Sequence, residues 1–330
     1  MDRRLLQNIG LAILSTLLCL LGLEILARLT YTQPWYEQLV LHQGRNEASS
    51  YTKNRFGLRG PDFVQPKPPG HHRILVLGDS FTYGFGVADD AAVFPARLEE
   101  RLRAEVDLPG VEHFEVLNGG IPGSLTDEWL ELWDQVGDAF DPDTVMIVFF
   151  LRDGTQTGSI PGFFGVIREQ IVERNAQSFP YRVSYGYRWV RDRLDRVAVA
   201  ERYTRGFHEA YFGDAEQTVE WQNAQRNLLE LRDRIQARGA QVAFVVFPIL
   251  VDLGDDYPFE EICQLLEDFG NTHGMPTHNL LPAFRGRRGS DFWVSALDQH
   301  PNAEGHRVAA ESLFPFLEEL LASSPGAGLD

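Results

Sequence analysis

From residue 73 to the end of the last predicted helix, short apolar runs alternate with longer stretches in which apolar residues recur every three or four positions. The short runs predict buried β-strands and the longer stretches predict amphipathic helices. The predicted strands cover residues 74–77, 114–117, 144–150, 240–247 and 277–281. The predicted helices cover residues 91–106, 126–140, 219–238 and 259–274, and a final helix runs from an Asn302 cap to about Leu321. Because strands and helices alternate, they predict a three-layer α/β/α fold around a flavodoxin-like parallel sheet of about five strands, with right-handed crossovers.

The alternation stops between about residues 155 and 217, a stretch that is rich in Phe, Tyr and Arg. It is longer than an ordinary connection between a strand and a helix, and insertions of this size are often lids or binding elements. Two interpretations stay open. The stretch is either a helical insertion whose aromatic side chains pack together, or an element that contacts the substrate.

The N-terminal segment has a different pattern. Arg3 and Arg4 precede a charge-free apolar run from Leu5 to Leu23, which as a helix is roughly 28 Å long, close to the thickness of the hydrocarbon core of a bilayer. A cleaved signal peptide fits less well because no small-residue cleavage pattern follows the run, and a lipoprotein site at Cys19 lacks the small residues expected before it. We therefore predict a single-pass membrane anchor over residues 1–30. Its basic N-terminus stays in the cytoplasm, so the rest of the chain lies on the extracytoplasmic side, periplasmic or extracellular.

The predicted organisation beyond the anchor has three parts. Residues 31–72 form a linker or strap, residues 73–322 form the α/β domain with its insertion, and residues 323–330 form a short tail. Prolines interrupt regular structure in the linker. Its segment 54–61 mixes aromatic and basic residues, and we interpret it as a strap that lies across the domain.

Composition and charge narrow the possible partners. The 330 residues are 44% hydrophobic and 23% charged, as is usual for a globular protein. The net charge of −17 repels phosphate backbones, so a nucleic-acid partner is not expected. The two cysteines, Cys19 and Cys263, lie in unrelated segments, which argues against a disulfide. No Cys/His cluster has metal-ligand spacing, and we expect neither a metal nor an organic cofactor.

Candidate catalytic residues lie next to the predicted strands. Ser80 follows the first strand, Gly120–Gly123 the second and Arg152 the third, while Asp298 and His300 precede the last helix. Since ligands of open parallel sheets bind beyond the carboxyl ends of the strands, we expect these loops to converge on one edge. A serine hydroxyl becomes an effective nucleophile when a base takes its proton and a third group orients that base. Ser80, His300 and Asp298 supply these three groups.

Two motifs resemble those of the SGNH (GDSL-type) hydrolase family, and the resemblance runs over about residues 72–316. The sequence closely resembles a bacterial subgroup with an N-terminal membrane anchor. The first motif, Gly78-Asp-Ser-Phe-Thr-Tyr-Gly84, implies that Ser80 is the nucleophile and that its backbone N–H contributes to the oxyanion hole. The second, Asn118-Gly-Gly-Ile-Pro-Gly123, implies that the N–H of Gly123 is a further oxyanion donor.

A third motif, near the C-terminus, resembles the family's histidine motif. The segment after the third predicted strand departs from the family's pattern. Asp298-Gln-His-Pro-Asn302 implies that His300 is the base and Asp298 its orienting partner, although one residue separates them where many members have two. After the third strand the family usually has Gly-x-Asn-Asp, whose asparagine donates to the oxyanion, whereas this chain has Phe150-Leu-Arg-Asp153. Arg152 either serves the oxyanion in place of that asparagine or has a structural role.

These features predict a serine-dependent ester hydrolase, an esterase or deacetylase that works through a Ser-His-Asp triad and an acyl-enzyme. Its expected substrate is an ester-bearing small molecule or an O-acylated glycan. If a sugar hydroxyl replaces water, the same triad makes the protein an O-acyltransferase that modifies an exported polysaccharide. The remaining alternative is a non-catalytic glycan-binding or assembly protein of the same fold, which the unusual Arg152 favours and the retained triad opposes.

Overall fold

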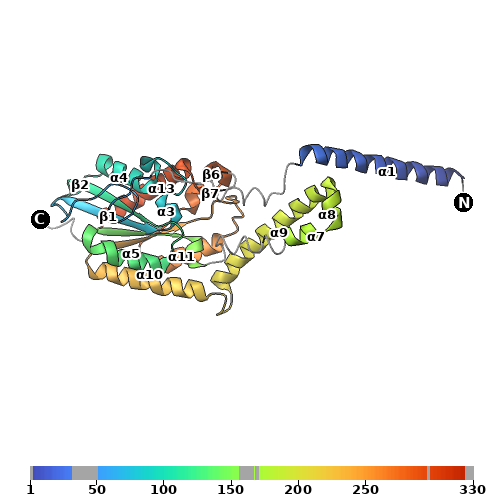
Figure 1. Ribbon diagram of the computed structural model, residues 1–330. Helices are drawn as coiled ribbons and strands as arrows, with labels where there is room; N and C mark the ends of the chain where they lie inside the picture. Colours follow the sequence, from blue (N-terminus) through green and yellow to red (C-terminus); the bar gives the residue numbers. More distant parts are fainter. Residues whose placement is uncertain (1–2, 32–50, 156–166, 168–170, 296–297, 324–330) are drawn as a thin grey trace. The chain divides into compact units, whose positions relative to one another are not determined.

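The structure, a computed structural model, describes residues 3–31, 51–155, 167, 171–295 and 298–323 (Figure 1). Its internal contacts divide the chain into two units. We call them the helical unit, Met1–Arg45 with Gly158–Arg205, and the sheet unit, Asn46–Thr157 with Gly206–Asp330.

The sheet unit is built on five parallel strands in the order β2-β1-β3-β4-β5. The strands are β1 (His71–Gly78), β2 (His113–Gly120), β3 (Thr144–Phe150), β4 (Gln241–Phe247) and β5 (Thr277–Asn279). The central strand β3 is buried along its whole length, because helices cover both faces of the sheet. The predicted α/β/α fold with a flavodoxin-like strand order is confirmed.

The helices divide between the two faces of the sheet (Figure 1). They are α4 (Phe94–Glu105) and α13 (Ala303–Ala322) on one face, and α5 (Thr126–Phe140), α10 (Val219–Ala237) and α11 (Glu260–Thr272) on the other. On the second face, the ring of Phe149 from β3 contacts Trp129 of α5 and Trp221 of α10, with centroids 6.2 and 6.0 Å apart. Trp221 also contacts Phe269 of α11 at 5.4 Å. These aromatic residues join the sheet to three helices.

Short elements connect the strands and helices. They are α3 (Ser80–Tyr83), η1 (Asp90–Ala92), η2 (Leu151–Gly154), α12 (Leu281–Phe284), η4 (Gly289–Phe292), β6 (Trp293–Ser295) and β7 (Asp298–Pro301). Strands β6 and β7 form an antiparallel pair that the sequence pattern does not predict. Each of them has only three or four residues, which is too short for a recognisable alternation of apolar and polar positions.

Two of the boundaries that differ from the predicted ones have a clear local cause. The helix predicted over 91–106 starts only at Phe94, because the Asp89 side chain caps the separate 3-10 turn η1 and Pro95 occupies the first turn of α4. Strand β1 begins at His71 rather than at residue 74, since its first residues pair in register with those of β2. Polar residues at the start of a strand carry no apolar signal, so the pattern places them in the linker.

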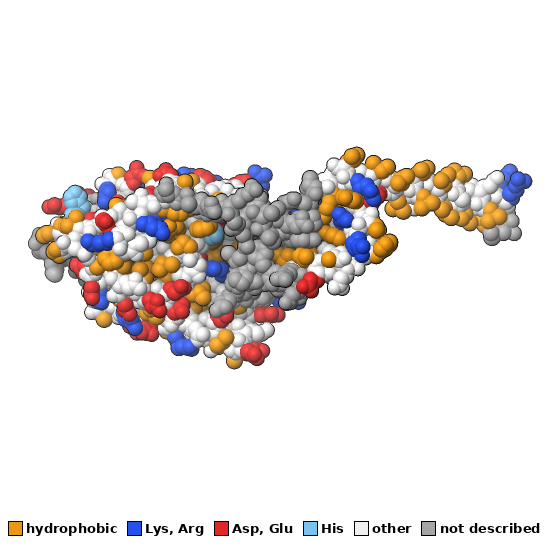
Figure 2. All heavy atoms as spheres, in the orientation of Figure 1, with side chains coloured by type: hydrophobic (Ala, Val, Ile, Leu, Met, Phe, Trp, Pro, Cys, Tyr) orange, Lys and Arg blue, Asp and Glu red, His pale blue; other side chains and the backbone are white. Residues whose placement is uncertain are grey.

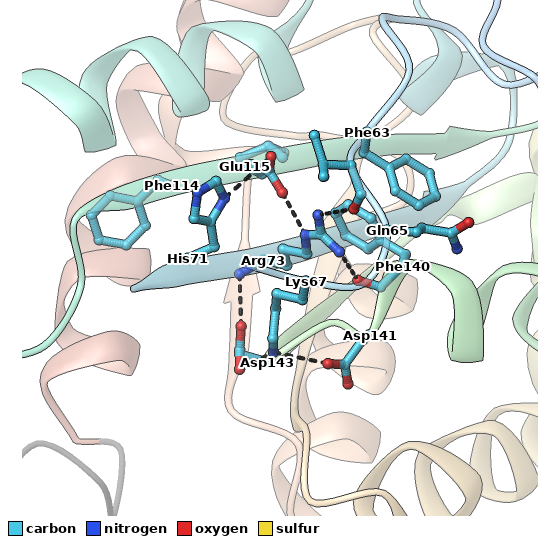
Figure 3. Close-up of polar contacts among 12 residues, drawn as sticks. Phe63, Gln65, Lys67, His71, Arg73, Phe114, Glu115, Phe140, Asp141 and Asp143 are labelled. Atoms are coloured by element: carbon cyan, nitrogen blue, oxygen red, sulfur yellow. Dashed lines mark hydrogen bonds and ion pairs between the residues drawn. The ribbon is translucent and has the colours of Figure 1, made fainter. Parts of the chain in front are cut away.

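A buried arginine fixes part of the predicted strap to the amino end of the sheet (Figure 3). The guanidinium of Arg73 on β1 donates to the carbonyl oxygens of Val64 and Phe140 at 2.6 and 2.8 Å and forms an ion pair with Glu115. The Arg73 side chain is fully buried, so losing these partners would leave an unpaired charge in the interior.

A second buried arginine, Arg59, fixes the strap at the opposite end of β1. It donates to the carbonyl oxygens of Tyr83, Gly84 and Val87 at 2.7–3.1 Å and pairs with Asp90 at 2.7 Å. Arg59 and Arg73 therefore fix the described part of the strap between residues 51 and 72 to the sheet unit.

The helical unit contains α1 (Arg3–Thr30), α7 (Glu173–Gln177), α8 (Phe179–Val183) and most of α9 (Tyr185–Phe212). Within the described residues, α1 is the one helix long and apolar enough to cross a membrane, although an N-terminal signal sequence would meet the same criteria. The described part of the predicted insertion is helical. Tyr181 is buried in the helical unit, whereas Phe207 and Tyr211 are buried in the sheet unit.

Candidate active site

The turn after β1 presents Ser80 at the carboxyl edge of the sheet. Asp79 caps the short helix α3, because its Oδ1 accepts a hydrogen bond from the backbone N–H of Phe81 at 2.8 Å. Gly78 ends the strand where a Cβ atom would lie 2.2 Å from Oγ1 of Thr82 and 2.9 Å from the carbonyl oxygen of Val148. Only glycine fits there, so the turn can bend tightly and carry the serine next to the strand end.

The hairpin of β6 and β7 brings His300 to this serine. Nε2 of His300 lies 2.9 Å from Oγ of Ser80, and Nδ1 lies 2.6 Å from Oδ1 of Asp298. A carboxylate only accepts hydrogen bonds, so Asp298 selects the tautomer with the proton on Nδ1 and leaves the Nε2 lone pair facing the hydroxyl. The rings of Phe81 and Phe85 flank the imidazole, with centroids 5.5 and 5.0 Å away. The structure thus brings together the three residues predicted to act as nucleophile, base and orienting acid.

Asn302 holds the hairpin against the start of α13. Its Oδ1 accepts from the backbone N–H groups of Glu304 and Gly305, and its Nδ2 donates to the carbonyl oxygens of Asp291 and Trp293 at 3.0 Å each. The sequence predicts the capping bonds. The other two bonds, to Asp291 of η4 and Trp293 of β6, depend on elements that the sequence does not reveal.

The turn that contains Gly123 lies beside the nucleophile turn. The backbone N–H of Ile121 donates to the carbonyl oxygen of Gly78 at 3.0 Å, and the hydroxyl of Ser124 lies 3.4 Å from the same oxygen. Gly123 has a φ of +85°, a conformation that side chains disfavour, and a Cβ there would meet no atom within 4 Å. Backbone conformation, rather than lack of space, accounts for this glycine.

Arg152, in the short helix η2 after β3, forms ion pairs with two buried carboxylates. Its Nη2 lies 3.2 Å from Oδ2 of Asp79 and 3.7 Å from Oδ1 of Asp153. The same Asp79 oxygen lies 3.3 Å from Oγ of Ser80. Arg152 therefore connects to the nucleophile through Asp79, a contact that sequence reasoning missed.

The environment of these carboxylates is electrostatically unusual. Burial raises the pKa of Asp79 and raises that of Asp153 well above its ordinary value, while the positive charge of Arg152 acts against both shifts. The neighbouring negative charge of Asp79 raises the pKa of Asp153 further. One guanidinium balances at most one of the two charges, so the cluster disfavours ionisation of both carboxylates at once.

His306 serves the packing of α13 and does not join Ser80 and His300. It is fully buried, and its Nδ1 accepts a hydrogen bond from the backbone N–H of Phe94 at 3.3 Å. Among the residues that the structure describes, no group of three or more His, Cys, Asp or Glu side chains is arranged to hold a metal ion.

Comparison with known proteins identifies one matching family. The model of the GDSL-like lipase/acylhydrolase family matches residues 76–308. No curated protein matches the chain.

Several solved structures align with the chain at low identity. A catalytic mutant of the acetylxylan esterase Axe2 from Geobacillus stearothermophilus is 14% identical with a TM-score of 0.46, over 74% of this chain and 93% of its own. The crystal structure of TesA is 18% identical with a TM-score of 0.46, over 76% and 99%. The lipase/acylhydrolase from Enterococcus faecalis is 16% identical with a TM-score of 0.44, over 76% and 96%.

Proposed function

Because the chain belongs to the GDSL-like lipase/acylhydrolase family, we propose that it is a serine-dependent ester hydrolase with Ser80 as nucleophile, His300 as base and Asp298 as the residue that orients the base. The observation that carries the proposal is the continuous hydrogen-bonded path from Ser80 through His300 to Asp298, with distances of 2.9 and 2.6 Å. Both distances lie within the range required for proton transfer between a nucleophile and its base.

The reaction proceeds in two half-reactions. As Oγ of Ser80 attacks the ester carbonyl carbon, its proton moves to Nε2 of His300, and Asp298 stabilises the imidazolium that forms. The tetrahedral intermediate collapses, the C–O bond to the alcohol breaks, and His300 gives its proton to the departing alkoxide. Water then attacks the acyl-enzyme while His300 again takes a proton, and the carboxylic acid leaves as Oγ of Ser80 regains its hydrogen.

The negative charge of the tetrahedral intermediate requires hydrogen-bond donors. We assign this role to the backbone N–H groups of Ser80 and Gly123, whose turns lie side by side through the Ile121 to Gly78 hydrogen bond. Arg152 is engaged with Asp79 and Asp153, so we assign it to holding the nucleophile turn. A hole with one donor fewer than the usual three costs roughly 100- to 1,000-fold in rate.

The test compares the full-length protein in detergent with its Ser80→Ala variant on p-nitrophenyl acetate. We expect hydrolysis to fall at least about 1,000-fold, because the acyl-enzyme cannot form. Ser290→Ala is the matched control, since Ser290 lies on the exposed turn η4 and makes the same change in side chain. Equal rates for the wild type and Ser80→Ala would reject the proposal and favour a non-catalytic binder.

The same assay separates hydrolysis from acyl transfer. We propose that α1 anchors the domain on the extracytoplasmic side, where exported polysaccharides pass, and a sugar hydroxyl there competes with water for the acyl-enzyme. Adding a soluble glycan acceptor and analysing the products by mass spectrometry distinguishes free acid from acylated glycan. Free acid as the main product supports the hydrolase, and acylated glycan supports the O-acyltransferase.

A further inference from the structure

One side chain fixes the end of the apolar helix α1 to the start of α9. Oε2 of Glu24 accepts hydrogen bonds from the hydroxyl of Ser184 at 2.7 Å and the backbone N–H of Gly186 at 3.0 Å, and Oε1 accepts from the N–H of Tyr185 at 2.9 Å. These donors are the otherwise unpaired groups at the amino end of a long helix. Arg28 adds a hydrogen bond to the carbonyl oxygen of Val183 at 3.3 Å.

This contact sets the depth of α8 and α9 relative to a membrane that α1 crosses. The charge-free run of α1 ends at Leu23, so Glu24 marks the level at which the hydrocarbon core ends. Residues 184–186 bond directly to that carboxylate and lie at the same level. The first turns of α9 consequently start in the headgroup region.

An exposed apolar stripe runs from the end of α8 along the outer face of α9. Its members recur at intervals of four and three residues, and each has 41–56% of its surface exposed: Val183, Tyr187, Val190, Leu194 and Val197. Trp189, 53% exposed, lies beside the stripe, and Phe179 of α8, 70% exposed, precedes it. Tryptophan and tyrosine are the residues enriched where a protein meets the membrane–water boundary.

The charges around this stripe suit anionic headgroups. Residues 179–205 contain seven arginines and three acidic residues, in a chain whose net charge is −17. Two of the acidic residues face inward, since Asp192 accepts from the hydroxyls of Tyr31 and Tyr181, and Asp195 pairs with Arg174 and Arg191. Arg182 and Arg193 remain exposed beside the stripe.

Figure 2 shows the same combination, with hydrophobic side chains along α1 and both hydrophobic and basic side chains on the helices of the helical unit. We propose that the outer face of α8 and of α9 up to Val197 is a membrane-interface surface, which lies on an anionic lipid bilayer with the apolar stripe toward the acyl chains and the arginines among the headgroups. The proposal rests on α1 being the membrane anchor and is independent of the ester chemistry. It gives the helical unit a second attachment to the membrane besides α1.

The test measures the depth of single fluorescent labels in the full-length protein. The protein is reconstituted in phosphatidylcholine vesicles with about 30% phosphatidylglycerol, and an environment-sensitive dye is attached at Val190→Cys in a Cys19→Ala background. Burial raises the pKa of the Cys263 thiol, which keeps that residue unreactive in the folded protein. Val219→Cys is the matched control, because Val219 is 47% exposed on α10 and lies outside the surface. Native Cys19, labelled in the unsubstituted chain, reports whether α1 lies in the hydrocarbon.

We expect a nitroxide-bearing lipid to quench the dye at position 190 at least about twofold more than the dye at position 219, and aqueous iodide to show the opposite order. The difference should decrease in pure phosphatidylcholine, because the arginines lose their anionic partners. Equal iodide quenching at 190 and 219 would overturn the proposal. A dye at 190 that is shielded from both quenchers would overturn it in favour of contact with a second copy of the chain. A dye at Cys19 that the lipid does not quench would overturn the anchor and the surface together.

Discussion

At the scale of single residues, the replacement of the family's usual asparagine by Arg152 changes what supports the nucleophile. An asparagine there is neutral, whereas Arg152 carries the positive charge that faces Asp79 and Asp153, whose side chains are 1% and 0% exposed. Breaking a buried ion pair leaves an uncompensated charge, which costs far more than the pair itself contributes. The position therefore affects the stability of the nucleophile turn as well as the reaction.

Arg152→Ala should lower the free energy of unfolding by about 3–5 kcal/mol, measured by urea denaturation. Adding Asp153→Asn should recover part of the loss, because it removes one of the two carboxylates. Arg234→Ala, which breaks an exposed pair with Asp134, is the control and should cost less than about 1 kcal/mol. If Arg152→Lys kept full stability yet lost most of kcat, Arg152 would be an oxyanion donor instead.

His306 should make the stability depend on pH. Burial lowers its pKa to about 3 from an ordinary 6.5, so between these values the unfolded chain binds a proton that the folded protein does not. Stability due to the neutral ring is fully present above pH 6.5 and decreases as the pH falls. Asp79 and Asp153, whose pKa values are raised, make the stability change with pH in the opposite direction. The test therefore compares the wild type with a variant that lacks only His306.

The variant for this test is His306→Gln, whose side-chain oxygen can still accept from the N–H of Phe94. Between pH 7 and pH 5 the wild type should lose about 2 kcal/mol more of its unfolding free energy than the variant. Urea denaturation at the two pH values measures this difference. Parallel losses in the two proteins would show that His306 is protonated in the folded state.

The residue types of the site follow from the sequence better than their contacts do. Ser80, Gly123, Asp298 and His300 lie in short motifs whose spacing is constrained by chemistry, so the sequence alone selects them. Arg152 has a long, flexible side chain. Whether it contacts Asp79, Asp153 or the oxyanion depends on tertiary packing, which a local sequence pattern does not predict. The roles of all five residues stay predictions until variants are assayed.

At the scale of elements, the hairpin of β6 and β7 positions the base. It is joined to α13 through Asn302. The Asn302 side chain hydrogen-bonds to backbone N–H groups at the start of α13 and to backbone carbonyl oxygens of η4 and β6. The long strands and helices were predictable because apolar periodicity accumulates over many residues. The hairpin was not, since its residues are few and its fold is set by Asn302 and by the neighbouring η4 turn.

Asn302→Ala should lower the free energy of unfolding by about 1–3 kcal/mol and reduce kcat/KM roughly tenfold. Asn302→Asp separates the two roles, because a carboxylate still accepts from Glu304 and Gly305 but repels the carbonyl oxygens of Asp291 and Trp293. We expect this variant to retain more stability than the alanine variant and to lose as much activity. Full activity in both variants would mean that the hairpin holds His300 without Asn302.

At the scale of the whole molecule, the N-terminal segment packs against the other helices of the helical unit. Glu24 and Tyr31 supply partners for Ser184, Tyr185 and Asp192 of the helical unit. Cleavage by a signal peptidase beyond Glu24 would remove the partner of Ser184 and Tyr185. The contacts therefore favour retention of the N-terminal segment. Helix length and composition do not distinguish a retained segment from a cleaved signal peptide.

Protein purified from membranes should consequently have an intact N-terminal segment, as measured by intact-mass spectrometry. Glu24→Gln should leave the mass unchanged and loosen the start of α9, seen as faster amide hydrogen exchange at residues 185–190, because a neutral acceptor binds helix N–H groups more weakly. Glu201→Gln on the exposed part of α9 is the control. A measured mass that corresponds to a chain starting after Ala27 would identify the segment as a cleaved signal peptide.

The bond between Glu24 and Tyr185 also has a consequence for synthesis, because its two residues are 161 positions apart. At roughly 5–20 residues per second, a ribosome needs about 8–32 s between making the first partner and the second. Strands β1 to β3 are translated within this interval. During it, Glu24 is paired with Arg28 of its own helix, and its capture by the nascent α9 would mark the moment at which the two halves of the helical unit first meet.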